Sequence, residues 1–306
     1  MNLHHLRLFA AVVDHGGFTK AAESLHLSQP AISKSLNELE RQLNLTLIER
    51  GGRSIRLTAA GQMLYARARE LFGVERVAEQ ELREVRGLKR GVLRIGASTT
   101  IATYVLPPFL GRFHLRHPGI RIRASSANTR TVLRMLLESR VDLTLVEGPV
   151  SHPQVDVQPW REDELVVISH PEHELLSRGD VDVAMLVRQQ FIVREPGSGT
   201  RVVSARALAL HGGRLTNTMR VGGTEAIKQA VAAGLGLAIV SRAAAADQLA
   251  LGKIAVVSVN GLAIRRTLTQ IKLRGRVSTA AARELESLLA DGAAADNPGD
   301  ASGTPR

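Results

Sequence analysis

Two short segments combine hydroxyl side chains with the start of a helix that directly follows a strand-like apolar run. Residues 96–100 read Gly-Ala-Ser-Thr-Thr, and residues 194–200 read Arg-Glu-Pro-Gly-Ser-Gly-Thr. Backbone N–H groups and hydroxyls at a helix start favour an anion, and the glycines beside Ser198 permit close backbone approach. The pattern predicts an anion site, with ordinary helix capping as the alternative. The candidate ligand residues are Ser98, Thr99, Thr100, Ser198, Gly199 and Thr200.

A carboxylate is expected at the same place. Glu147 ends the strand predicted at 141–146, and ligands of α/β domains lie at the carboxyl ends of strands. A carboxylate beside a fully ionised anion is unfavourable unless one of them is protonated. Glu147 therefore disfavours sulfate and leaves room for sulfite-like acids, polyols or phosphosugars. A structural Glu147, paired with an arginine or a helix, is the alternative.

A second group of polar residues precedes residue 58. Gln29, Ser33 and Lys34 are predicted on one face of a helix whose other face is apolar. Gln can pair with adenine, Lys can reach guanine acceptors, and Ser can contact bases or phosphates. Pro30 can touch a thymine methyl group. This face is predicted to read DNA, with an ordinary solvated helix face as the alternative.

A basic hairpin is predicted directly after that helix. Residues 49–58 alternate around a Gly-rich turn, and five arginines with no acidic residue occur between positions 50 and 69. A basic hairpin beside a helix-turn-helix can grip phosphates as a wing. One arginine alone is an ordinary surface charge, so Arg50, Arg53 and Arg56 are assigned to the phosphates together.

The elements that position these residues change in type along the chain. Helices are predicted over residues 3–13, 18–25, 28–43 and 59–89. The last has Leu64, Leu71, Ala78 and Val85 at seven-residue spacing, which favours a dimerisation helix over one packed on its own domain.

Beyond residue 91, strands and helices alternate, which is typical of a parallel α/β sheet. Strands are predicted at 92–97, 120–125, 141–147, 165–169, 191–194, 218–221, 237–241 and 254–259, and helices at 98–100 onward, 131–138, 201 onward, 224–233 and 278–289. Residues 291–306 have no apolar period and are predicted to be disordered.

Composition excludes several classes of protein. The chain has 306 residues, a formal net charge of +11, 44% hydrophobic residues and no cysteine, so thiol chemistry and disulfides are excluded. No P-loop, dinucleotide fingerprint or histidine cluster supports catalysis or a metal site, so neither an enzyme nor a cofactor is expected. No membrane span or signal peptide is predicted, which favours the cytoplasm.

Several motifs together resemble the LysR-type transcriptional regulators. They are Phe18–Ala22 (Phe-Thr-Lys-Ala-Ala), Leu27–Ser33 (Leu-Ser-Gln-Pro-Ala-Ile-Ser), Leu47–Arg50 and Leu57–Gly61. The resemblance implies a winged helix-turn-helix over residues 1–58, a linker and dimerisation helix over 59–89, and an effector domain over 90–290. That domain would be a two-lobed α/β fold like the type II periplasmic solute-binding proteins, with lobe I at 90–162 and 268–290 and lobe II at 163–267. It also implies a homodimer or homotetramer on double-stranded promoter DNA, commonly acting through RNA polymerase.

Four motifs of the second half are similar to a subgroup that includes regulators of sulfur assimilation and carbon fixation. They lie at 98–107, 146–149, 194–201 and 223–228. That subgroup responds to oxyanions or phosphorylated metabolites. The resemblance implies effector contacts at Ser98, Thr99, Thr100, Glu147, Ser198, Gly199 and Thr200. The rival classes are a solute-binding receptor without transcriptional action and an architectural DNA binder.

Overall fold

The computed structural model describes residues 1–49, 55–85 and 91–295. The chain divides into two compact units, residues 1–82 with 138–140, and the rest of the chain from residue 83. We describe each unit separately. Among the described residues, no helix is long and apolar enough to cross a membrane.

The N-terminal unit begins with three helices, as the sequence predicts. These are α1 (Leu3–Asp14), α2 (Phe18–Leu25) and α3 (Gln29–Leu43). The Ser28 hydroxyl caps α3 by accepting a hydrogen bond from the N–H of Ala31 at 3.4 Å. Side chains at helical spacing form the core that holds the three helices together: Leu6, Phe9, Val12, Ala21, Ile32, Leu36 and Leu39.

A short hairpin and a long helix complete this unit. Strands β1 (Ile48–Glu49) and β2 (Arg56–Leu57) pair antiparallel, which confirms the predicted hairpin. Helix α4 (Ala59–Val85) follows, and its first turn is capped because the Thr58 hydroxyl accepts from the N–H of Gly61 at 3.0 Å. The predicted end of this helix, residues 86–89, lies outside the described residues, as do Arg50 and Arg53 of the hairpin.

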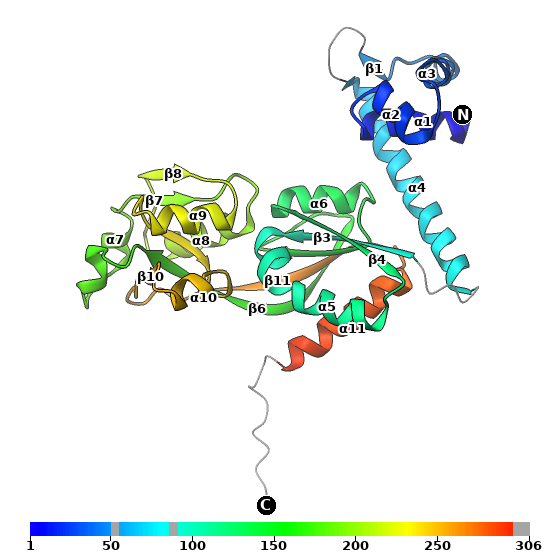
Figure 1. The fold of residues 1–306 in the computed structure, drawn as a ribbon. Coiled ribbons are helices and arrows are strands. Elements are labelled where there is room, and N and C mark those ends of the chain that lie inside the picture. The colour runs from blue at the N-terminus through cyan, green and yellow to red at the C-terminus, as the bar shows by residue number, and fades with distance from the viewer. Residues whose placement is uncertain (50–54, 86–90, 296–306) are drawn as a thin grey trace, which may run out of the picture. The chain divides into compact units, whose positions relative to one another are not determined.

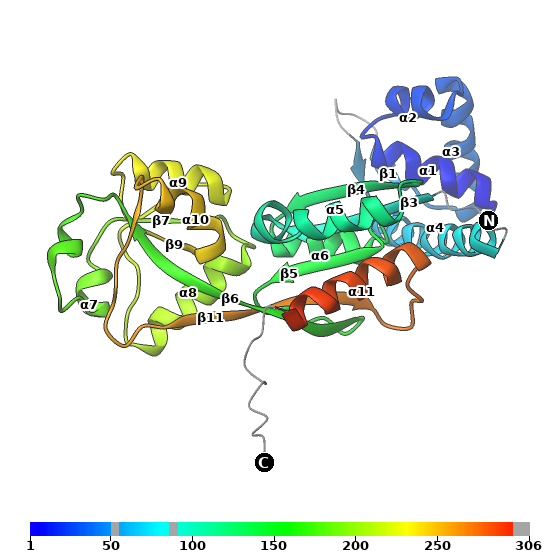
Figure 2. The same cartoon turned by 60° about the horizontal axis from the view of Figure 1, so that its bottom comes forward.

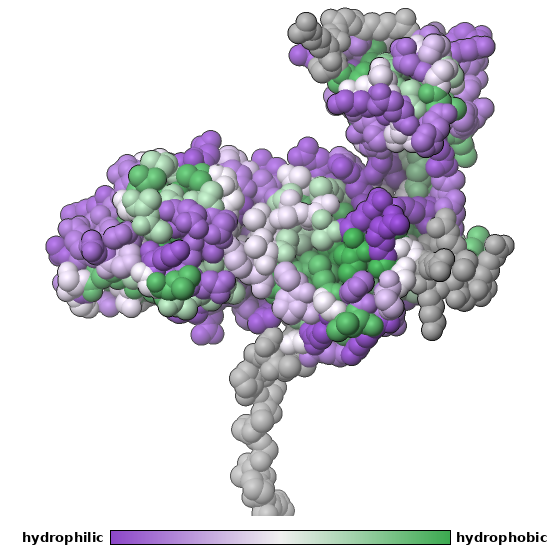
Figure 3. Space-filling view, viewed as in Figure 1, coloured by the Kyte–Doolittle hydropathy of each residue, from purple (hydrophilic) through white to green (hydrophobic). Residues whose placement is uncertain are grey.

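The larger unit contains two groups of elements, lobe I and lobe II, which are joined by two long strands (Figures 1 and 2). Lobe I is a sheet covered by helices, with a core that includes Leu93, Ile95, Phe113 and Leu145. Its elements are β3 (Gly91–Ser98), the π-helical segment η1 (Ile101–Val105), α5 (Pro107–Arg116), β4 (Ile120–Ala127), α6 (Thr129–Leu137), β5 (Leu143–Glu147) and α11 (Ala280–Ala295). Figure 3 shows a hydrophobic area around β3 and β4 on an otherwise mixed surface.

Lobe II is built from shorter elements around a second core, which includes Val167, Leu186, Phe191 and Leu237. Strands β7 and β8 pair parallel, and a bridge between Phe191 and Leu237 continues that pairing. The elements are η2 (Glu174–Ser177), α7 (Val183–Leu186), β7 (Phe191–Val193), α8 (Gly199–Leu210), β8 (Thr218–Arg220), α9 (Thr224–Ala232), β9 (Ala238–Ser241), α10 (Arg242–Ala250) and β10 (Ala255–Val256).

The two connecting strands are β6 (Val155–Ser169) and β11 (Ile264–Leu273). They pair antiparallel along their length, from Ile264 opposite Leu165 to Leu273 opposite Val155. The seven-stranded sheet has the order β10-β6-β11-β5-β3-β4, with β9 also paired to β6. The prediction of a parallel sheet is therefore wrong in part: within this sheet β3 pairs parallel with β4 and β5, whereas β11 pairs antiparallel with β5 and β6.

Other sequence-based boundaries also need correction. The helix predicted from residues 98–100 onward is divided in two: η1 ends at Val105 and α5 begins at Pro107, where a missing N–H costs nothing. The end of α11 lies in the segment predicted to be disordered. Gly292 is buried there, and a Cβ on it would lie 2.4 Å from the Phe109 ring. Residues 291–295 are helical because this turn packs on α5. The strand predicted at 254–259 is shorter in the structure, where only β10 is a strand.

Candidate DNA-binding surface and candidate effector site

The first turns of α3 present polar side chains to solvent. Gln29, Pro30 and Lys34 are exposed and Ser33 is half-buried, whereas the opposite face of the helix is in the core. The local reason is the Ser28 cap, which begins α3 just before these residues. The turns carry donors and acceptors that major-groove base edges can pair with, and the recognition helix of a helix-turn-helix enters the groove by this end.

The hairpin adds a positive charge next to α3. Arg56 is exposed on β2, and Glu49 lies opposite it in the strand pair. Arg50 and Arg53, the two other arginines assigned to phosphates, lie outside the described residues.

Helix α4 exposes apolar side chains. Leu71, Val74 and Leu82 are 42%, 70% and 66% exposed, although large aliphatic side chains are usually buried. Leu71 belongs to the predicted seven-residue repeat, Val74 and Leu82 lie at helical spacing from it, and the three together form an apolar seam on α4. An apolar seam that remains exposed on one chain is what a dimerisation helix presents to a second copy.

The first candidate effector segment lies at the carboxyl end of β3. Ser98 and Thr100 are 0% and 1% exposed, and the Ser98 hydroxyl has no hydrogen-bond partner among the described residues. The Thr99 hydroxyl donates to the carbonyl of Ala127 at 3.3 Å. The chain turns into a helix at residue 99, as predicted. No hydrogen bond joins this segment to residues 198–200, all of which the structure describes.

The second candidate segment forms the start of α8 and touches lobe I. The Ser198 hydroxyl caps the helix by accepting from the N–H of Arg201 at 3.4 Å. A Cβ on Gly199 would lie 1.6 Å from the carbonyl oxygen of Glu147, so only glycine fits there. Ser198 therefore has a capping role, and Gly199 has a packing role that the sequence did not reveal.

Glu147 and Thr200 meet at a buried charge network between the lobes. The Thr200 hydroxyl donates to Oε1 of Glu147 at 3.3 Å, and Nη2 of Arg266 lies 2.9 Å from Oε2. The same guanidinium lies 2.6 Å from Asp163, its neighbour across β6 and β11, and donates to the Thr200 hydroxyl at 2.9 Å. The structure agrees with the alternative prediction for Glu147, in which it is a structural carboxylate paired with an arginine.

The sequence analysis missed Arg266 and Asp163. Arg266 is 4% exposed, yet it lies in a run, Ile264–Leu273, with no motif and with polar residues that predict a surface. The available signal is strand parity, because Arg266 lies two residues from both Ile264 and Leu268 and so faces the same side of a strand as these apolar residues. A buried arginine is stable only when it is paired, and Asp163 and Glu147 provide the pairs.

A second set of missed residues joins the lobes beside α8. Arg194 is buried and holds Glu195 through Nε and Nη2, at 2.8 and 2.9 Å, while its Nη1 donates to Thr224 at 3.0 Å. Asn128 of lobe I donates to Glu195 at 3.3 Å. Burial acts to raise the pKa of Glu195, but the hydrogen bonds from Arg194 and Asn128 outweigh it and lower the pKa to about 2.

A third contact joins η1 to α9. The Tyr104 hydroxyl donates to Glu225 at 2.7 Å, and the ammonium of Lys228 lies 4.8 Å from the centre of the Tyr104 ring. Lys228 is 3% exposed and donates to the carbonyl of Ala244 at 2.7 Å. Burial raises the pKa of Tyr104, so its hydroxyl stays protonated and keeps donating. Together with a hydrogen bond from the N–H of Arg130 to the carbonyl of Gly197 at 3.2 Å, these polar contacts hold the two lobes together.

Comparison with known proteins agrees with this architecture. Residues 3–62 match the model of the bacterial regulatory helix-turn-helix protein, lysR family, and residues 86–294 match the LysR substrate binding domain. The RuBisCO operon transcriptional regulator of Allochromatium vinosum is 35% identical over 294 residues, covering 96% of this chain and 97% of the relative. The HTH-type transcriptional regulator CysL of Bacillus subtilis is 30% identical over 266 residues, covering 87% and 89%.

A solved structure matches the larger unit. The regulatory domain of Synechocystis CcmR, in complex with 2-PG, has a TM-score of 0.61 and 26% identity, covering 67% of this chain and 98% of that domain. A helix-turn-helix unit followed by a two-lobed α/β domain defines a ligand-responsive DNA-binding regulator. The chain belongs to the LysR family of transcriptional regulators, and its relatives support the carbon-fixation and sulfur-assimilation subgroup. It is a DNA-binding regulator and not an enzyme.

Proposed function

We propose that the protein binds promoter DNA sequence-specifically through α3, with base contacts from Gln29, Pro30, Ser33 and Lys34. The support is the exposed first turns of a helix whose other face is core. Arg50, Arg53 and Arg56 contact phosphates beside the groove and carry no sequence information. Because its partner is promoter DNA, we expect the protein to act in the cytoplasm.

The active form is a homodimer or homotetramer that contacts RNA polymerase at the promoter. The exposed seam of α4, with Leu71, Val74 and Leu82, supports a contact between two copies. Light scattering of the full chain tests this contact: Val74→Glu should dissociate the dimer, while Glu75→Gln on the same helix should leave it intact. A Val74→Glu variant that remains dimeric contradicts the role of this seam.

The effector of this regulator is a small anionic metabolite, an oxyanion or a phosphorylated compound, bound between the lobes. It contacts Ser98, Thr99, Thr100, Glu147, Ser198, Gly199 and Thr200. The observation that carries this proposal is the buried Ser98 hydroxyl without a partner, beside a helix start that offers N–H groups. The position of Arg266 beside Glu147 and Asp163 also supports it, because the guanidinium offsets part of their charge and Glu147 then repels an anion less than an isolated carboxylate would.

Effector binding acts by changing the contact between the lobes. Strands β6 and β11 are continuous through both lobes, so a shift of one lobe relative to the other is absorbed at these strands. The ligand favours one arrangement over another by its difference in affinity for the two. That shift alters the packing of the oligomer and hence the presentation of the paired DNA-binding units.

A thermal-shift screen of the full chain tests the effector proposal. The probes are 2-PG, sulfite, sulfate, thiosulfate, phosphoenolpyruvate, a sugar bisphosphate and NADPH. A ligand at 100 times its dissociation constant should stabilise the protein by about 2.7 kcal/mol. Ser98→Ala and Thr100→Val should abolish the shift, whereas Ser177→Ala, remote in η2, should leave it unchanged. A screen without a hit, or a hit that survives Ser98→Ala and Thr100→Val, contradicts the proposal.

A further inference from the structure

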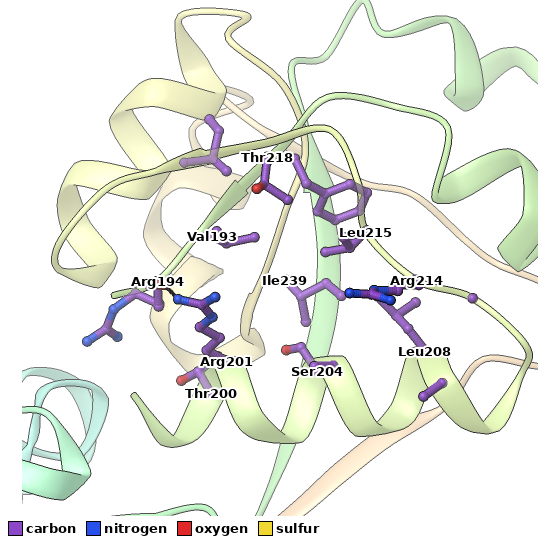
Figure 4. A pocket seen from close by; sticks show the side chains of 15 residues that line it. Val193, Arg194, Thr200, Arg201, Ser204, Leu208, Arg214, Leu215, Thr218 and Ile239 are labelled. Carbon is purple, nitrogen blue, oxygen red and sulfur yellow. Dashed lines mark hydrogen bonds between the residues drawn. The ribbon is translucent and has the colours of Figure 1, made fainter. Parts of the chain in front are cut away.

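Lobe II encloses a cavity that is separate from the candidate effector residues at the end of β3. It has a volume of about 370 Å³ and lies between α8 and the strands β7, β8 and β9 (Figure 4). Volumes of about 300–1,000 Å³ are typical of small-molecule sites. Phe191, Val193, Leu208, Leu215 and Ile239 provide apolar walls. The cavity has room for a compact organic molecule, and all of its lining residues belong to lobe II.

One buried polar group in the wall lacks a partner. Ser204 is 8% exposed, and its hydroxyl has no hydrogen-bond partner among the described residues. Serine within a helix commonly bonds back to the preceding turn, and buried polar groups are almost always paired. Figure 4 shows the Ser204 side chain projecting from α8 between Arg201 and Arg214. An unpaired hydroxyl in the wall of a cavity is a hydrogen-bonding group for a ligand.

The charge of the cavity identifies the kind of ligand. Arg194, Arg201 and Arg214 line it, and no lining residue is acidic. The Arg194 guanidinium is neutralised by Glu195, whereas Arg201 only donates to the carbonyl of Arg194 at 3.3 Å. Arg214 forms no hydrogen bond or ion pair with any described residue. Arg201 and Arg214 thus have no acidic partner among the described residues, and guanidinium groups bind carboxylates and phosphates in a bidentate manner.

We propose that this cavity is a second ligand site, which takes a small organic anion with an apolar body, such as an aliphatic or aromatic carboxylate. Arg201 or Arg214 pairs with the anionic group, Ser204 bonds to it, and the apolar walls cover the body. A void left by imperfect packing explains the volume, but it does not explain a buried hydroxyl without a partner among the described residues in a wall that carries arginines and no acidic residue. The proposal goes beyond the proposed effector site, because Arg201, Ser204 and Arg214 are not among the proposed effector contacts.

The cavity shares one residue, Thr200, with the charge network between the lobes. Thr200 lines the cavity at the first turn of α8, and its hydroxyl donates to Glu147 and accepts from Arg266. A ligand that moves α8 therefore acts on the network between the lobes. We expect occupancy of the cavity to change effector affinity, and the effector to change affinity at the cavity by the same factor.

Isothermal titration of the full chain tests the proposal with benzoate and hexanoate as probes and with benzamide and hexanamide as neutral counterparts. At least one carboxylate should bind saturably, and its amide should bind at least tenfold more weakly. Arg214→Gln, a change at an exposed residue, should weaken carboxylate binding at least tenfold. Ser204→Leu, which fills the cavity, should abolish it, and Ser204→Ala should weaken it.

Two control variants locate the binding. Arg206→Gln makes the same charge change on the exposed face of α8, outside the cavity, and should bind like the wild type. Thr100→Val, at the proposed effector site, should also bind like the wild type. Absence of saturable binding by either carboxylate overturns the proposal. Equal losses in Arg214→Gln and Arg206→Gln overturn it too, as does binding that Thr100→Val removes and Ser204→Leu does not.

Discussion

The DNA-binding unit and the effector domain hold their candidate functional residues in opposite ways. In α3 these residues lie within two turns of one helix, and Gln29, Pro30 and Lys34 face solvent. In the effector domain, Glu147, Thr200 and Arg266 come from β5, α8 and β11 and are buried, and the side chain of Asp163 from β6 is 7% exposed. A solvent-facing side chain can change without affecting folding, whereas a buried charge is part of the packing. Substitutions on the exposed face of α3 should therefore change DNA binding without changing stability. Substitutions in the buried charge network should change both effector response and stability.

The largest effect is expected at Arg266. Arg266→Met should lower the free energy of unfolding of the effector domain by about 3–5 kcal/mol, because it leaves Glu147 and Asp163 as uncompensated buried charges. Urea unfolding followed by the fluorescence of Trp160, the single tryptophan of the chain, measures this loss. The matched control is Arg242→Met, which breaks an exposed pair with Glu164 and should cost at most about 1 kcal/mol. Equal losses in the two variants would contradict the view that the buried arginine contributes more to stability than the exposed one.

The next effect concerns the close contact of α8 with β5. Gly199→Ala should destabilise the effector domain by about 1–3 kcal/mol or more, because the new methyl group would overlap the carbonyl of Glu147. Gly111→Ala in α5 is the control, since no atom lies within 4 Å of its Cβ position. That change should stabilise the protein by about 0.5–1 kcal/mol through helix propensity. Thermal unfolding of both variants decides whether the lobes touch as tightly as the structure shows.

An effect on function alone is expected at Lys34. Lys34→Ala should reduce discrimination at one base pair by about 1–3 kcal/mol, because it removes a base contact, and should leave thermal stability unchanged. Selection of binding sites from a random DNA pool measures the change in preference. Arg41→Ala, at the far end of α3, should leave the preference unchanged. Weakening that is equal on all sequences would instead assign Lys34 to the phosphates.

The smallest effect is a pH dependence at Glu195. Its pKa falls to about 2 in the folded state, below the ordinary value of 4.5, so the carboxylate stabilises the fold above pH 4.5. That contribution is lost as the pH falls from about 4.5 towards 2, because protonation breaks the pair with Arg194. The stability difference between wild type and Glu195→Gln should therefore shrink as the pH is lowered from 6 to 3.5. Glu172→Gln, at an exposed position, should show a constant difference, and a constant difference for Glu195→Gln would contradict this assignment.

Much of the fold and part of the site could be predicted from the sequence. The helices of the N-terminal unit, the hairpin before α4 and most strands of lobe I follow from apolar periodicity, the Ser28 cap and turn residues, which act over a few positions. The candidate base-reading face of α3 could also be predicted from the sequence, since its residues lie on one helix. Such features depend on neighbours in the chain, so a sequence displays them directly.

The tertiary structure decided what depends on residues far apart in the chain. The antiparallel pairing of β6 with β11 placed Arg266 beside Asp163 and changed a predicted parallel sheet into a mixed one. The packing of Gly292 on Phe109 turned a predicted tail into helix. Buried polar groups require partners, and those partners come from whichever elements meet in space. The sequence by itself thus determined the local elements and the family. Only the folded chain decided that Glu147 pairs with an arginine and that the Ser98 and Ser204 hydroxyls have no partner among the described residues.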